Sequence, residues 1–166
     1  MDTMVPIRSA VQRARRISLT AGPAAAAQAR SLVQAAIRAW DVPVDPPTAA
    51  LLTSELVTNA IRHEKGEIIM LVINCDCGQF RVDVHDTSRS EPVQEDASAY
   101  AETGRGLMLV SDLSTSWGYY PTLKGKAVYF TLAYQVNLGT GEDRSAKGDR
   151  GPAKNERAGR TRRRPD

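Results

Sequence analysis

A polar stripe inside an otherwise apolar helix constrains this chain more than any other feature. Glu55, Asn59 and His63 follow one another at intervals of four residues, so they lie on one face of an α-helix. The residues around them leave little solvent face: Leu51, Leu52, Leu56, Val57, Ala60 and Ile61. Burying three polar side chains is costly unless something binds them. The stripe therefore predicts a ligand-filled cleft, with a solvated surface stripe as the simpler alternative.

A strand that ends in a carboxylate is the second informative feature. Asp86 continues the alternating apolar face of Phe80, Val82 and Val84, so its side chain is expected to point toward the core. A buried carboxylate needs a hydrogen-bond donor.

A glycine pair that opens a short apolar helix is the third feature. Gly104 and Gly106 flank Arg105, and an apolar run begins at Leu107. Such a junction presents free backbone N–H groups and the positive end of a helix dipole, which suits a phosphate group. A Gly-x-Gly is weak evidence alone, and a turn without a ligand is the alternative.

Together the three segments resemble the N, G1 and G2 boxes of the GHKL (Bergerat-fold) ATPases, and most closely the small histidine-kinase-like anti-sigma factors that act as serine/threonine kinases in bacteria. The patterns are Glu-Leu-Val-Thr-Asn-Ala-x-x-His at 55–63, Asp-x-Ser-x-x-x-Pro at 86–92 and Gly-Arg-Gly-Leu-x-Leu-Val at 104–110. Ser88 and Ser90 depart from the gyrase-like members, which carry glycines there. This departure leaves the hinge before the lid stiffer.

The resemblance implies ATP and Mg²⁺ as ligands and assigns a role to each candidate residue. Glu55 would be the general base, Asn59 would offer its side-chain oxygen to Mg²⁺, and Asp86 would accept a hydrogen bond from the adenine amine. The phosphates would be approached by residues of the glycine pair and by two cations: Gly104, Arg105, Gly106, Leu107 and Lys126. His63 would contact phosphate, hold the lid expected at 87–103, or support a residue that itself contacts the ligand.

The function that the resemblance implies is a regulatory switch. Such a protein holds a sigma factor inactive and phosphorylates a serine or threonine of an anti-anti-sigma (STAS-type) partner, usually as a homodimer. Three alternatives remain: a catalytically silent, ATP-dependent protein-binding module, a nucleic-acid-associated regulator, and the catalytic domain of a two-component histidine kinase. The last would need a helix pair with a phosphoacceptor histidine, which is not apparent in these 166 residues.

Length and charge favour one small cytoplasmic domain with a basic tail. A chain of 166 residues has room for one modest core, and we expect no membrane span and no secretion signal. Residues 23–135 carry nine Lys or Arg against thirteen Asp or Glu, whereas residues 136–166 carry nine against five. The tail has no aromatic residue for stacking on bases. We therefore expect it to be disordered and direct nucleic-acid binding to be absent.

The two cysteines, Cys75 and Cys77, fall in an expected turn between two strands. A zinc site would need about four ligands, and only His85 is an additional candidate. A strained redox link is the alternative, and a reducing cytoplasm favours free thiols.

The pattern of strands and helices predicts an α+β fold, a two-layer sandwich of a mixed, mostly antiparallel sheet with helices on one face. Strands are expected at 15–19, 67–75, 79–86, 115–120 and 126–134. Helices are expected from Gly22-Pro23 to Trp40, from after Pro47 to about His63, and after Gly106. The chain then divides into an N-terminal arm (1–14), the ATPase-like domain (15–135) and the tail (136–166).

Overall fold

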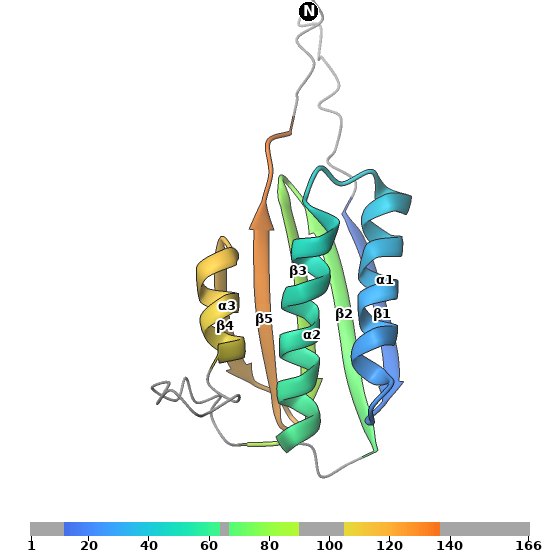
Figure 1. Cartoon of the computed structure of the whole chain (residues 1–166), viewed down its shortest axis with the longest axis vertical. Helices are drawn as coiled ribbons and strands as arrows, with labels where there is room; N and C mark the ends of the chain where they lie inside the picture. Colours follow the sequence, from blue (N-terminus) through green and yellow to red (C-terminus); the bar gives the residue numbers. More distant parts are fainter. Residues whose placement is uncertain (1–11, 64–66, 90–104, 137–166) are drawn as a thin grey trace, which may run out of the picture.

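Three helices cover one face of a five-stranded sheet (Figure 1). The computed structural model describes residues 12–63, 67–89 and 105–136. Its strands are β1 (Arg13–Thr20), β2 (Ile68–Asp76), β3 (Gln79–Asp86), β4 (Ser116–Pro121) and β5 (Lys126–Ala133). Its helices are α1 (Ala25–Trp40), α2 (Pro46–His63) and α3 (Arg105–Leu113). The predicted α+β sandwich with helices on one sheet face is confirmed.

The strand order is β1-β2-β3-β5-β4, and each neighbouring pair is antiparallel. The parallel pairing that a mixed sheet would contain therefore does not occur among the described strands. The reason is that β2–β3 and β4–β5 are hairpins, and β5 lies antiparallel to β3 where the two hairpins meet. This junction places the last residue of β3 opposite the first residue of β5, so Asp86 faces Lys126 across the sheet.

The start of α2 follows from its first residues. Pro46 occupies the first helical position, where a missing N–H is harmless. The carboxylate of Asp45 accepts hydrogen bonds from the backbone N–H of Thr48 at 3.0 Å and from its hydroxyl at 2.6 Å. The Thr48 hydrogen bonds lower the pKa of Asp45. This cap sets where the helix that carries the polar stripe begins.

The turn between β2 and β3 is two residues long, because Cys77 and Gly78 both have positive φ angles of 43° and 80°. Two positive φ angles give the strands the twist of a tight hairpin. Asp76, expected in the turn, is instead the last residue of β2. At the sheet edge, β1 begins at Arg13, two residues before the expected strand. The reason is that Arg13 pairs with Cys75 of β2.

The hydrophobic core lies between the sheet and the helices. Its largest fully buried side chains come from α1, α2 and α3 and from β2, β3 and β5: Val33, Leu52, Leu56, Val57, Val110, Ile69, Leu71, Ile73, Phe80, Val82, Val84 and Phe130. Helix α2 contacts α1, α3, β3 and β5, so it is the central element of the helical layer. The polar stripe is thereby held beside α3.

Candidate functional site

Helix α2 carries Glu55 and Asn59, which are both half-buried. The amide nitrogen of Asn59 is buried and has no hydrogen-bond partner in the part of the chain that the structure describes. Leaving a buried polar group unpaired costs free energy, and a side chain in this condition is suited to a ligand. His63 is the last residue of α2, and its side chain lies outside the part of the chain that the structure describes.

The first turn of α3 packs against Glu55. A methyl group placed on Gly106 would collide with the Glu55 carboxylate, so these two groups are in close contact and a side chain at Gly106 would displace the acid. Leu107 is buried beneath this turn, whereas Arg105 is exposed. The N-terminal end of a helix carries partial positive charge. The structure therefore brings the predicted acid to a helix end that favours anions, while Gly104 lies outside the described residues.

The end of β3 holds a buried ion pair. The ammonium of Lys126 lies 3.2 Å from each carboxylate oxygen of Asp86, and the side chains are only 4% and 1% exposed. The backbone N–H of Ser88 donates to the same carboxylate at 2.9 Å. As alternation predicts, Asp86 shares the buried face of Val84.

The β4–β5 turn closes over this ion pair. Gly125 lies so close to the backbone of Asp86 and Thr87 that no side chain fits there, and a Cβ would be 2.6 Å from two backbone atoms of Thr87. The turn is held by hydrogen bonds from the Thr122 N–H to the Gly125 carbonyl at 2.9 Å and from the Gly125 N–H to the Thr122 hydroxyl at 3.1 Å. Sequence reasoning placed a turn here but missed its role as a support for Asp86.

A cavity of about 500 Å³ opens beside the turn. It is lined by Arg89, Tyr119, Pro121, Thr122, Leu123, Gly125 and Lys126. A volume in this range suits a ligand of nucleotide size. Residues 90–103, which form most of the predicted lid, lie outside the described residues.

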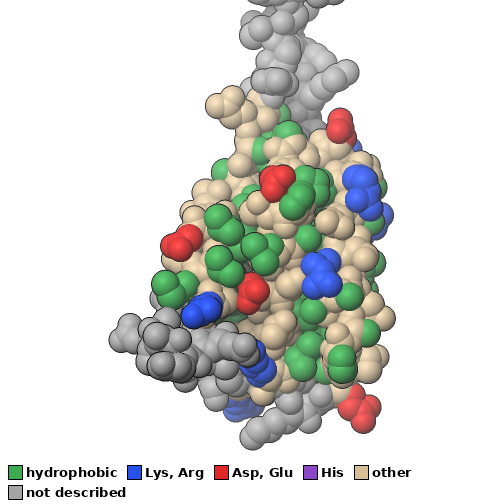
Figure 2. All heavy atoms as spheres, viewed as in Figure 1, with side chains coloured by type: hydrophobic (Ala, Val, Ile, Leu, Met, Phe, Trp, Pro, Cys, Tyr) green, Lys and Arg blue, Asp and Glu red, His purple; other side chains and the backbone are tan. Residues whose placement is uncertain are grey.

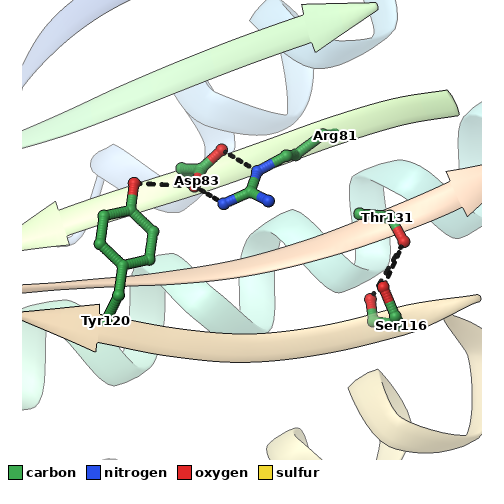
Figure 3. Close-up of polar contacts among 5 residues, drawn as sticks. All are labelled: Arg81, Asp83, Ser116, Tyr120 and Thr131. Atoms are coloured by element: carbon green, nitrogen blue, oxygen red, sulfur yellow. Dashed lines mark hydrogen bonds and ion pairs between the residues drawn. The ribbon is translucent and has the colours of Figure 1, made fainter. Parts of the chain in front are cut away.

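A second polar cluster lies on the sheet face opposite the helices (Figure 3). Asp83 is buried and accepts hydrogen bonds from the Arg81 guanidinium at 2.6 and 2.9 Å and from the Tyr120 hydroxyl at 3.1 Å. The guanidinium stacks 3.8 Å from the ring centre of Tyr129. The hydrogen bond to Asp83 raises the pKa of Arg81, and burial raises the pKa of Tyr120. Burial also lowers the pKa of the neighbouring His85.

Sequence reasoning missed this cluster, although the alternation of polar residues along β3 indicates it. Arg81, Asp83 and His85 occupy every second position of β3, which indicates one shared face. Their burial depends on aromatic side chains from β4 and β5, which no local pattern places there.

The cysteines lie at the other end of β3 from Asp86, near a cavity of about 230 Å³. Both are free, as predicted; Cys75 is buried and Cys77 is exposed. The sulfur of Cys75 lies 3.0 Å from the Tyr134 hydroxyl, and burial together with this contact raises the pKa of Tyr134 to about 12. Within the described residues no group of three or more His, Cys, Asp or Glu side chains could hold a metal ion.

Exposed apolar side chains gather on the helical face, over α3 (Figure 2). Met108, Leu109 and Leu113 are between 37% and 44% exposed. They lie on the helix whose first turn contacts Glu55. Large exposed apolar patches on soluble proteins can serve as contact surfaces for other proteins.

A family model matches most of the described chain. The family model described as "Histidine kinase-like ATPase domain" matches residues 19–132, which include all three helices, β2, β3 and β4, all of β5 except its last residue, and only the last two residues of β1. None of the curated proteins matches the chain. Among the described residues, no helix has the length and apolar character needed to cross a membrane.

Proposed function

We propose, from the premise that this chain belongs to the histidine kinase-like ATPase family, that it is an ATP-dependent anti-sigma regulatory factor. In this role it sequesters a sigma factor and phosphorylates a serine or threonine of an anti-anti-sigma partner. ATP binding follows from the family itself. The kinase activity, the cytoplasmic location and the partners, including a second copy of the chain, are the proposal.

The observation that carries the proposal is the contact between Glu55 and Gly106. A carboxylate beside the first turn of α3 is close to the place where a helix end would bind a terminal phosphate. From there Glu55 can accept the proton of an attacking hydroxyl, which is the task of a general base in phosphoryl transfer. The oxygen of the partner hydroxyl forms a bond to the γ-phosphorus, and the bond from that phosphorus to the bridging oxygen of ADP breaks.

The amide nitrogen of Asn59 is an unpaired N–H donor, so it supports a phosphate acceptor nearby. The side-chain oxygen of Asn59 is then the atom that would hold a metal carried with the nucleotide. Mg²⁺ prefers oxygen ligands and is often bound through one or two protein groups plus substrate phosphates. Asn59 lies one turn beyond Glu55 on α2, so it would hold the ion near the reacting phosphate. When bound, the ion would neutralise charge on the phosphate oxygens.

The exposed apolar group on α3 supports a protein partner. A protein that covers Met108, Leu109 and Leu113 would lie next to the turn that contacts Glu55. Its serine or threonine could then reach the base without a substrate pocket in this chain. Arg105, which is also exposed at this turn, can contribute positive charge toward the phosphates.

The test is transfer of labelled γ-phosphate from ATP to an anti-anti-sigma protein. Glu55→Gln should retain ATP but lose transfer by about 10²-fold or more, and Asn59→Ala should lose both ATP and transfer. Glu67→Gln, which changes an exposed acid outside the site, is the matched control and should behave as wild type. Transfer by Glu55→Gln at the wild-type rate would exclude Glu55 as the general base. ATP binding without any transfer by the wild type would favour the catalytically silent, ATP-dependent binding module.

A further inference from the structure

The ion pair of Lys126 and Asp86 lies in the interior beside a cavity and not on the protein surface. Both side chains are almost completely buried, and taking two charges out of water offsets much of their attraction. Lys126 also lines the cavity of about 500 Å³. Lys126 is therefore a buried cation that borders a cavity, with its partner Asp86 directly behind it.

The hydrogen-bonding capacity of Lys126 is only partly used. An ammonium has three N–H donors and no acceptor, and the contacts of Lys126 within the described residues are those to the two oxygens of Asp86. One N–H donor of the Lys126 ammonium therefore remains, and it lies beside the Asp86 carboxylate, whose oxygens are acceptors 3.2 Å from the ammonium. This donor and acceptor form a fixed pair.

The pair matches one edge of adenine. Adenine presents an amine donor at position 6 next to an acceptor nitrogen at position 1. Guanine presents the reverse, a carbonyl acceptor at position 6 next to an N–H donor at position 1. Against Asp86 and Lys126, guanine would set acceptor against acceptor and donor against donor, and unpaired buried polar groups are costly.

We propose that Lys126 is a specificity-determining residue of the nucleotide site that donates a hydrogen bond to N1 of adenine, beside the amine contact of Asp86. This inference rests on the proposed function, because it assumes that the cavity receives the base of ATP. It gives Lys126 a task at the base, in place of the phosphate contact that the sequence resemblance implied.

The backbone around Lys126 supports a fixed position rather than a mobile one. Gly125 is packed against the backbone of Asp86 and Thr87, so the start of β5 cannot slide along β3. Lys126 is also paired in register with Asp86 in the sheet. Its ammonium is therefore held at the end of β3, while the candidate general base Glu55 is held at the first turn of α3.

The first test uses the wild-type protein and a series of nucleotides, so that it does not depend on a variant that folds. Calorimetry compares ATP with 1-deaza-ATP, in which a C–H replaces N1, and with inosine triphosphate, in which position 6 is a carbonyl and N1 carries hydrogen. We expect 1-deaza-ATP to bind at least about tenfold more weakly than ATP, the scale of a hydrogen bond to a charged group. Inosine triphosphate should bind more weakly still.

The second test removes the ammonium with Lys126→Met, using Lys124→Met of the same turn, which changes an exposed lysine, as the matched control. The ratio of ATP to 1-deaza-ATP affinity should fall to about one in Lys126→Met and stay at the wild-type value in Lys124→Met. Equal binding of ATP and 1-deaza-ATP by the wild type would overturn the inference and leave the proposed function standing. Failure of the wild type to bind ATP at all would overturn both.

A phosphate contact gives a different pattern. In that case Lys126→Met would weaken ATP and 1-deaza-ATP by the same factor and leave adenosine binding unchanged. This result would also overturn the inference.

Discussion

Replacing Gly125 by alanine is the sharpest test of how the β4–β5 turn supports Asp86. The added methyl carbon would lie 2.6 Å from the carbonyl carbon and the Cα of Thr87, where ordinary contacts begin at 3.4 Å. The deficit of roughly 0.8 Å falls on backbone atoms, which cannot rotate away as a side chain can. The turn must therefore move away from β3, and the ion pair of Asp86 and Lys126 must move with it.

The magnitude follows from two opposing effects. Overpacking of this kind costs about 1–3 kcal/mol, whereas alanine stabilises a compatible site by about 0.4–1 kcal/mol because it restricts the unfolded chain. We therefore expect Gly125→Ala to lower the free energy of unfolding by roughly 1–2 kcal/mol. Its affinity for ATP should fall as well, because the displaced turn carries Lys126.

Urea denaturation and calorimetry with ATP measure both effects. Gly22→Ala is the control, since no atom lies within 4 Å of a Cβ at that position, and it should be neutral or stabilise by up to about 1 kcal/mol. A Gly125→Ala protein that unfolds at the wild-type urea concentration and binds ATP normally would refute the idea that this contact positions Asp86.

Three further predictions concern other parts of the molecule. Gly106→Ala should leave the melting temperature unchanged or slightly higher, because alanine suits a helix better than glycine by about 0.5–1 kcal/mol. The rate of phosphate transfer should nevertheless fall, because the added methyl group displaces Glu55. An unchanged transfer rate would contradict the role of Glu55 as general base. Burial lowers the pKa of His85 below 6.5, so the unfolded chain binds the proton more readily than the folded chain. The free energy of unfolding, measured with urea, should therefore decrease as the pH falls from about 8 to about 5. An equally steep decrease in His85→Gln would exclude His85 as the cause. The Cys77 thiol donates a hydrogen bond to the Asp76 carboxylate, which raises the pKa of Cys77. Asp76→Asn should therefore speed labelling of this exposed thiol by a maleimide through a larger thiolate fraction; an unchanged labelling rate would refute the effect.

Local sequence patterns determined the elements and the direction in which their side chains point. The four-residue spacing of Glu55 and Asn59 placed both on one face of α2, and alternation along β3 placed Asp86 on the buried face. These predictions succeed because helix and strand periods depend only on neighbouring residues. The roles of the candidate residues came from the resemblance to a family, and the family match supports that resemblance at the level of the domain.

The tertiary structure alone decided which distant groups meet. Lys126 reaches Asp86 because β5 returns beside β3, forty residues away along the chain, and Gly106 reaches Glu55 because α3 packs on α2. Asp83 is buried on the opposite face, where Tyr120 of the neighbouring hairpin donates a hydrogen bond to it. A periodic pattern records which way a side chain points but not what lies in front of it, since that depends on the register and packing of segments far apart in the sequence.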